Sequence, residues 1–180
     1  MIKRKIFIFS LFTSLLFSGE ISVSISEELV NDYLELIGDH EIPKGKKGDQ
    51  AIWTINEPHV RFQEGSAEFL ATVLYKKGKI NIKKNVSKNM YVEYNYDDNI
   101  IQLMIDKPFI KMERKNETLG KLDLGSLYQD GLKFQGPRPK TQTIKLKTMK
   151  GRIRIDMNIK KSLIYFEPGV VRVAIDLDYK

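Results

Sequence analysis

The sequence predicts an α+β fold, mostly antiparallel β, with a strongly curved sheet wrapped around one N-terminal amphipathic helix. Helical periodicity is confined to one segment near the start of the chain. Nearly every informative stretch after it alternates apolar and polar residues, as half-buried strands do. At 180 residues without cysteine, the chain is large enough to bury a core without disulfides, and thiol chemistry is excluded.

The first residues have the layout of a secretory signal peptide. Three cations at positions 3–5 precede an apolar run at 6–17, which is shorter than the roughly 17 to 25 residues that span a bilayer. We therefore expect residues 1–19 to be a signal peptide and residues 20–180 to form a single α+β domain that is periplasmic or secreted, in a bacterium. Retention as an uncleaved anchor is the alternative, because no A-x-A cleavage site is present.

Export changes how the positive charge is interpreted. The chain has a formal net charge of +7, to which the cations at 3–5 contribute three. An exported domain meets no nucleic acid, so we expect no nucleic-acid partner. The positive charge that remains favours peripheral contact with an anionic membrane, or it contributes only to solubility.

The first element of the mature chain is predicted to be a helix from Ile25 to Ile37. Ser24 and Glu27 fit a capping box, and Gly38 suits the left-handed conformation that ends a helix. Four apolar residues are predicted to form its buried face: Leu29, Tyr33, Leu36 and Ile37.

Strands follow in the order of the chain. A strand is expected near Ala51–Asn56, with Pro58 marking a bend, and another at Ala67–Tyr75 that turns near Gly78. The stretch NMYVEYNYDDNIIQLMID predicts two strands joined by a corner at 97–99. Further turns are expected near Gly151 and at Pro168-Gly169, which separate the last strands.

The stretch RIRIDMNI and the final strand have the clearest alternation. The apolar residues of the first are Ile153, Ile155, Met157 and Ile159. Those of the second are Val171, Val173, Ile175 and Leu177. Acidic residues on the other face of the final strand are predicted to pair with Arg152, Arg154 and Lys160.

The region from Asp106 to Gln142 is the least regular. We expect a short strand near Pro108–Met112, a helical turn near Gly125–Tyr128 and a loop that contains Gly136.

Element sizes indicate where a ligand could bind. A 13-residue helix is about 20 Å long and about 10 Å wide, whereas eight strands form a sheet nearly 40 Å across, at about 4.8 Å per strand. The sheet must therefore curl around the helix, close on itself or leave an apolar groove.

The helix ISEELVNDYLELI and the ending EPGVVRVAIDLDY resemble the small bacterial periplasmic proteins, usually lipoproteins, of the tubular lipid-binding (TULIP) type. The resemblance implies a sheet wrapped around an N-terminal helix and a role in lipid handling. Gly19 stands where those lipoproteins carry a lipid-modified cysteine, so no lipid anchor is expected.

Catalytic motifs do not emerge from the sequence. His40 and His59 have no metal-ligand spacing, no G-x-S-x-G motif is present, and GKKGD is not a phosphate-binding loop. We therefore expect no enzymatic activity, no metal and no cofactor.

The leading hypothesis is an exported, non-enzymatic envelope protein that binds a lipid or another apolar small molecule between helix and sheet. The alternative is a protein-interaction or structural module of the envelope, with a filled core and an envelope protein as its partner. The predicted apolar lining comprises Leu29, Tyr33, Leu36, Ile37, Ile153, Ile155, Met157, Ile159, Val171, Val173, Ile175 and Leu177.

Overall fold

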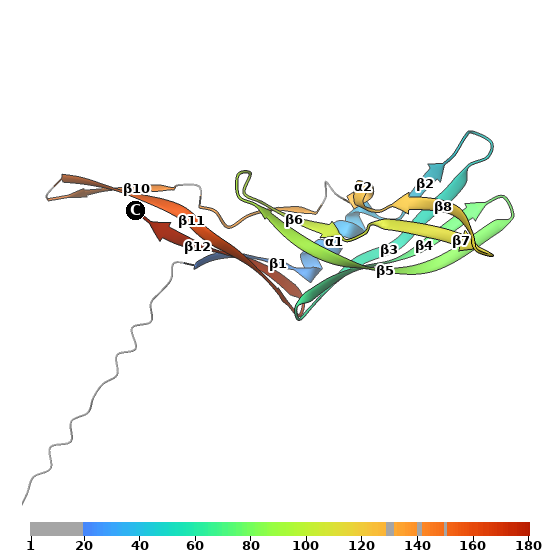
Figure 1. The fold of residues 1–180 in the computed structure, drawn as a ribbon, viewed down its shortest axis with the longest axis horizontal. Helices are drawn as coiled ribbons and strands as arrows, with labels where there is room; N and C mark the ends of the chain where they lie inside the picture. The colour runs from blue at the N-terminus through green and yellow to red at the C-terminus, as the bar shows by residue number, and fades with distance from the viewer. Residues whose placement is uncertain (1–19, 129–131, 140–141, 150) are drawn as a thin grey trace, which may run out of the picture.

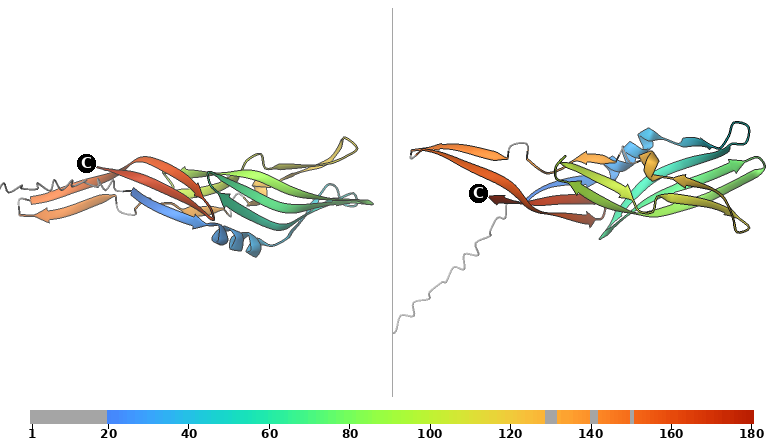
Figure 2. Two further views of the ribbon diagram at one scale, coloured as in Figure 1. Left: turned by 90° about the horizontal axis from the view of Figure 1, so that it is seen from below. Right: turned by 45° about the horizontal axis from the view of Figure 1, so that its top comes forward.

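The computed structural model describes residues 20–128, 132–139, 142–149 and 151–180 (Figure 1). The predicted signal peptide, residues 1–19, lies outside the described residues. The described chain is mostly antiparallel β, in strongly curled sheets with few helices, as predicted. The two larger sheets lie end to end in an elongated molecule (Figures 1 and 2).

One end of the molecule is a four-stranded sheet built from the two ends of the chain. Its strands, in spatial order, are β1 (Glu20–Ser26), β12 (Val170–Tyr179), β11 (Gly151–Glu167) and β10 (Thr143–Thr148). Each neighbouring pair is antiparallel.

The other end is a six-stranded antiparallel sheet with a smaller hairpin beside it. The strands of the sheet, in spatial order, are β2 (His40–Lys44), β3 (Ala51–Gln63), β4 (Ser66–Lys77), β5 (Ile80–Asn95), β6 (Ile100–Ile105) and β9 (Lys133–Gln135). The hairpin pairs β7 (Phe109–Arg114) with β8 (Glu117–Asp123), and the two helices are α1 (Glu27–Ile37) and α2 (Gly125–Tyr128).

The two sheets are joined where two hairpin turns meet. Gly65, in the β3–β4 turn, donates its N–H to Phe166 O at 3.0 Å. Gly169, in the β11–β12 turn, donates to Phe62 O at 3.1 Å. Both glycines have positive φ, 71° and 76°, a backbone region that costs other residues energy. The turns can therefore exchange backbone hydrogen bonds in the manner of paired strands.

Helix α1 covers the edge of β3 that no strand covers. Strand β2 pairs only with Ala51–Ile55, so no described strand pairs with the later residues of this edge of β3. Asn31 accepts from Val60 N at 2.7 Å and donates to Val60 O at 3.1 Å, and Glu27 accepts from Phe62 N at 2.6 Å.

The spacing of these contacts follows from helix and strand geometry. Four helical residues, from Glu27 to Asn31, advance about 6 Å, and two strand residues, from Val60 to Phe62, advance about 6.6 Å. A helix with polar residues four apart can therefore satisfy alternate amides of a strand edge, which would otherwise invite pairing with another chain.

The structure corrects the predicted start of the helix. Ile25 lies in β1, 2% exposed, and Ser24 pairs with Arg172 of β12. The N-cap is instead Ser26, whose hydroxyl accepts from Leu29 N at 3.1 Å, so the predicted capping box is wrong. Strand β1, rather than the helix, is the first described element.

The structure does not show a sheet wrapped around α1. The buried residues of the helix are Val30 and Leu34, whereas Leu29 is 50% exposed and Leu36 is 86% exposed. The predicted burial of Leu29, Tyr33 and Leu36 is therefore wrong, since Tyr33 is also exposed, and Ile37 is half-buried. The bonds of Glu27 and Asn31 to β3 fix the rotation of the helix, and residues at 30 and 34 share their face.

Most of the strands and turns agree with the sequence. The turns at 97–99, at Gly78 and at Pro168-Gly169 are confirmed, as are β7 and α2. The predicted pairing of Lys160 with the final strand is wrong. Asp176 lies opposite Lys161 instead, and its Oδ2 is 3.2 Å from Lys161 Nζ. Four strands were missed: β1, β2, β8 and β9.

The β12 partners predicted for Arg152 and Arg154 are also wrong. Strand β12 ends at Tyr179, opposite Met157, so both arginines lie beyond it. They face Lys147 and Lys145 of β10 instead.

We expect Asn31→Ala to lower the free energy of unfolding by about 1–3 kcal/mol, because it leaves the amide and carbonyl of Val60 without partners. Asp32→Ala, an exposed position on the same helix, should change it by less than about 0.5 kcal/mol. Urea unfolding monitored by circular dichroism measures both, and equal effects would contradict the role given to α1.

Candidate functional site

One apolar face runs along the whole four-stranded sheet. The strand registers place apolar residues of all four strands on it: Ile21, Val23 and Ile25 of β1; Val171, Val173, Ile175 and Leu177 of β12; Ile153, Ile155, Met157, Ile159, Ile164 and Phe166 of β11; and Ile144 and Leu146 of β10. The eight strand residues predicted as apolar lining therefore do share a face.

A β-bulge keeps this face continuous along β11. Alternation alone would put Ile159 and Ile164 on opposite faces, because their numbers differ by five. The register shift between Ile159 and Lys161 inserts one residue, so that Ile159 faces Leu177 and Ile164 faces Val173 on the same side.

Exposure along this face rises with distance from the junction. Val173 and Ile175 are fully buried, and Met157 and Ile159 are half-buried. Ile153 is 49% exposed and Leu146 is 46% exposed. The face therefore begins as part of the core and ends as an uncovered apolar surface.

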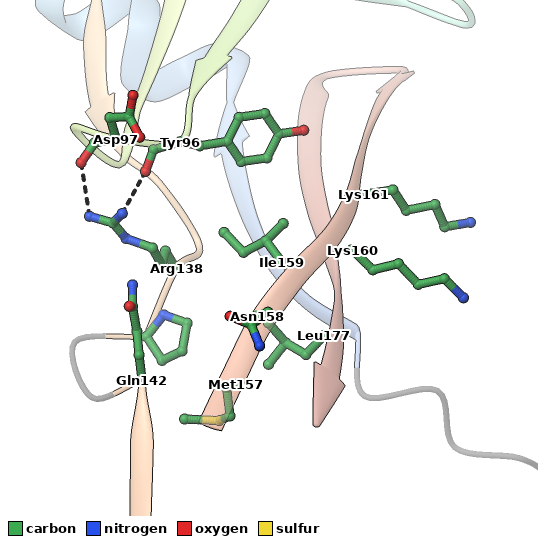
Figure 3. Close-up of a pocket in the computed structure, with 11 residues that line it drawn as sticks. Tyr96, Asp97, Arg138, Gln142, Met157, Asn158, Ile159, Lys160, Lys161 and Leu177 are labelled. Carbon is green, nitrogen blue, oxygen red and sulfur yellow. Dashed lines mark hydrogen bonds between the residues drawn. The ribbon is translucent and has the colours of Figure 1, made fainter. Parts of the chain in front are cut away.

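A groove lies between this face and the β5–β6 turn. A pocket of about 340 Å³ is lined by Met157, Ile159 and Leu177 on one side and by Tyr96 and Arg138 on the other (Figure 3). The side chain of Ile159 points towards Tyr96 and Arg138, and that of Met157 points towards Gln142, whereas Lys160 and Lys161 extend away from the pocket (Figure 3).

A second pocket continues along the same sheet face. It has a volume of about 560 Å³ and is lined by Ile164 of β11 and by apolar residues of β5 and β6 that include Val92 and Ile100. The rest of its lining is mostly polar: Glu93, Tyr94, Asn95, Asp98, Gln102 and Lys133. Between the two pockets, Tyr96 reaches across and its hydroxyl hydrogen-bonds to Ser162 Oγ. We call the two pockets together the inter-sheet groove, with the Tyr96–Ser162 bridge between them.

The wall of the groove opposite β11 is held by a buried network around Asn99. Asn99 has φ 55°, a left-handed conformation that asparagine tolerates, and it is the only buried polar residue in the described ranges. Its Oδ1 accepts from Tyr94 Oη at 2.8 Å and from Arg138 N at 3.0 Å, and its Nδ2 donates to Gly136 O at 3.2 Å.

Arg138 is held by the same turn. Its guanidinium donates to Tyr96 O at 2.7 Å and to Asp97 O at 3.0 Å. The arginine is therefore a structural link at the groove rim that keeps part of its charge accessible. No motif in the sequence points to Arg138, whereas Tyr96 belongs to a stretch with tyrosines at 91, 94 and 96.

The predicted helix residues do not join this site. Leu29 and Leu36 face solvent, and the pocket beside α1 is lined mostly by polar side chains, including Asn31, Glu35, Asp39 and His59. The predicted lining is thus divided. Met157, Ile159 and Leu177 line the groove, whereas Val171, Val173 and Ile175 are buried in the core. Ile153 and Ile155 lie on the same face outside the groove, and the helix residues lie elsewhere.

Titratable groups do not converge on a reaction centre. His40 lies in β2, and the Nδ1 of His59 in β3 is 2.9 Å from Glu57 O. Among the residues that the structure describes, no group of three or more His, Cys, Asp or Glu side chains could hold a metal ion.

A separate apolar pocket of about 200 Å³ lies near α2, lined by Leu103, Met104, Pro108 and Tyr128 among others. Burial, with the Asp39 carboxylate as a second cause, raises the pKa of Tyr128 to about 12. Within the described ranges its hydroxyl has no hydrogen-bond partner.

We expect Asn99→Ala to lower the free energy of unfolding by about 2–3 kcal/mol, because Tyr94 Oη and Arg138 N lose their acceptor inside the protein. Asn89→Ala, at an exposed position of β5, is the matched control and should stay within about 0.5 kcal/mol of wild type. Urea unfolding at neutral pH gives both values, and a loss at Asn99 no larger than at Asn89 would refute the network.

Tyr128 gives a pH prediction. Its phenol ionises near pH 10 in the unfolded chain but near 12 in the folded chain, so the stability it contributes is complete below about pH 10 and is lost as pH rises towards 12. At pH 11 the loss should be about 1 kcal/mol. Tyr128→Phe should remove this contribution to the loss of stability at high pH, and urea unfolding at pH 8 and pH 11 measures it. The same pH dependence in the variant and the wild type would contradict the prediction.

Comparison with known proteins adds no relative to this picture. No protein-family model matches the chain, and no curated protein matches it. A function must therefore be argued from the groove and the exposed apolar face themselves.

Proposed function

We propose that the protein is an exported, non-enzymatic envelope protein that binds the apolar chain of a lipid in the inter-sheet groove. One observation carries this proposal: the apolar face of the four-stranded sheet continues from the core into a pocket between the two sheets, where Met157, Ile159 and Leu177 line one wall. Soluble monomers rarely leave continuous apolar strips uncovered, and such strips mark binding surfaces.

The form of the groove favours a long, thin ligand. Two pockets of about 340 and 560 Å³ contact β11, the first at Met157–Lys161 and the second at Ile164, and both are within the size range of ligand sites. Met157, Ile159 and Ile164 offer apolar contacts along it, and Arg138 at the rim offers a cation to an acidic headgroup. The role in lipid handling that the TULIP resemblance implies agrees with this ligand class.

A non-enzymatic role is supported by how the polar groups are used. The polar groups of the groove wall bond to one another and to backbone groups, so their role is structural; they are those of Asn99, Tyr94 and Arg138. Binding would depend on apolar area removed from water, at about 25 cal/mol per Å², and would need few specific polar contacts.

Peripheral action is compatible with the described helices. Neither α1 nor α2 is long and apolar enough to cross a membrane. The predicted export and signal peptide rest on residues 1–19 alone.

The second candidate function is a protein-interaction module of the envelope. The specific observation in its favour is the apolar stripe on α1, where Leu29 and Leu36 are exposed beside Tyr33. The six-stranded sheet has a filled core, in which Trp53 and Tyr75 pack edge to face at 4.9 Å.

Ile159→Gln should weaken binding of a dansyl-labelled fatty acid by about tenfold, because it removes an apolar contact from the groove floor. Leu163→Gln, on the opposite face of the same strand, is the matched control and should bind as wild type. Fluorescence titration of the purified protein measures both, and native mass spectrometry reports any copurified lipid. Absence of copurified lipid and of probe uptake, or equal effects of both variants, would exclude the groove.

A further inference from the structure

We propose that the tip of the four-stranded sheet, the two-stranded ribbon of residues 143–149 and 151–156, docks on an anionic membrane surface. We call it the β10–β11 ribbon. Strand β12 ends opposite Met157, so among the described strands β10 alone pairs with residues 151–156 of β11 (Figure 1). This proposal concerns a different surface from the inter-sheet groove and does not depend on it.

The ribbon has one apolar face and one basic face. Ile144 pairs with Ile155 and Leu146 with Ile153, and these side chains share the exposed end of the apolar face. Lys145 pairs with Arg154 and Lys147 with Arg152 on the opposite face. Met149, at the turn, is fully exposed.

The surplus charge of the molecule is concentrated in this ribbon. Its described residues include four basic and one acidic side chain, whereas the remaining described residues carry 21 of each sign. The acidic residue, Asp156, is bonded to Arg154 at 2.9 Å and to Thr143 at 2.6 Å. In the described chain, no acidic side chain forms an ion pair with Lys145, Lys147 or Arg152.

Folding alone gives no reason for this arrangement. Like charges placed directly opposite each other destabilise a strand pair, and the ribbon contains two such pairs in succession. Its apolar residues have no layer packed over them, since Leu146 and Ile153 are about half exposed. A partner that offers both negative charge and an apolar phase would remove both costs.

An anionic bilayer surface offers both. Interfacial amphipathic segments bury their apolar face about 5–10 Å into the boundary between headgroups and acyl chains, with Lys and Arg on the other face. A ribbon lying flat would place Leu146 and Ile153 in this boundary and Lys147 and Arg152 among the phosphates. A nucleic acid would use the cations alone, and a second copy of the ribbon would use the apolar face alone.

The test is cosedimentation of the full chain with vesicles of phosphatidylcholine, with and without one third phosphatidylglycerol. We expect binding to the anionic vesicles that weakens as salt is raised. Lys147→Gln with Arg152→Gln should weaken it by about 30-fold, since each cation near the surface contributes about fivefold. Leu146→Asn with Ile153→Asn should weaken it at least tenfold.

Matched controls separate the ribbon from the rest of the molecule. Lys79→Gln with Lys83→Gln makes the same change in charge at exposed positions of the six-stranded sheet, and Leu29→Asn with Leu36→Asn removes exposed apolar side chains from α1. Both double variants should bind vesicles as wild type does. All variants are compared in the same processed form, established by intact mass, because a retained leader would itself bind lipid.

Several results would overturn the proposal. They are absence of vesicle binding, equal binding to neutral and anionic vesicles, or equal losses in the controls and the ribbon variants. Tighter binding to a duplex oligonucleotide, unaffected by the Asn substitutions, would assign the ribbon to nucleic acid. A dimer abolished by those substitutions, without vesicle binding, would assign it to a second copy. Loss of vesicle binding with fatty-acid uptake intact would leave the groove proposal standing.

Discussion

The architecture depends on how the backbone groups of β3 that lie past the end of β2 find hydrogen-bond partners. Glu27 and Asn31 bond the amides of Phe62 and Val60, so a helix completes an edge that no strand covers. The turns at Gly65 and Gly169 then bond to the ends of the neighbouring hairpins. These contacts join residues 27–31, 60–65 and 166–169 at the junction, and they hold the two sheets end to end rather than face to face.

The end-to-end arrangement explains why the apolar face remains open. Two sheets packed face to face would bury each other's inner residues and form a closed sandwich. Here only the part of the four-stranded sheet nearest the junction is covered, and the hairpin of β10 and β11 extends away from the six-stranded sheet (Figure 2). The bulge at Ile159 keeps the exposed and buried parts on one side of β11. The core and the candidate binding surface are therefore two parts of one alternating apolar pattern. The part that other elements cover is core, and the part that they leave exposed is the candidate binding surface.

The sequence predicts local structure better than the placement of elements. Strict alternation located β11 and β12, and turn residues located the corners at 97–99 and at Pro168-Gly169, because these signals depend on neighbours in the chain. The face of the helix could not be chosen in this way. Val30 and Leu29 each begin an apolar stripe, and the choice depends on the bonds of Asn31 to β3, 29 residues away.

The candidate site shows the same division. Ile153, Ile155, Met157 and Ile159 were identified by alternation alone, and they share one face as expected. The other wall of the groove needed information from distant residues: Arg138 reaches the turn at Tyr96 across more than forty positions, and Asn99 holds the loop that carries it. The cross-strand pairs of like charge in the ribbon also depend on register, which the sequence leaves undefined.

The central claim is that the uncovered end of the apolar face meets lipid, and spin-label depth measurements test it most directly. The chain has no cysteine, so single cysteines can be introduced one at a time from Arg152 to Ile159 without removing any. With anionic vesicles, oxygen accessibility should alternate with a period of two, high at Ile153 and Ile155 and low at Arg152 and Arg154. Labels that stay in water at every position, or a depth that does not alternate, would contradict the claim.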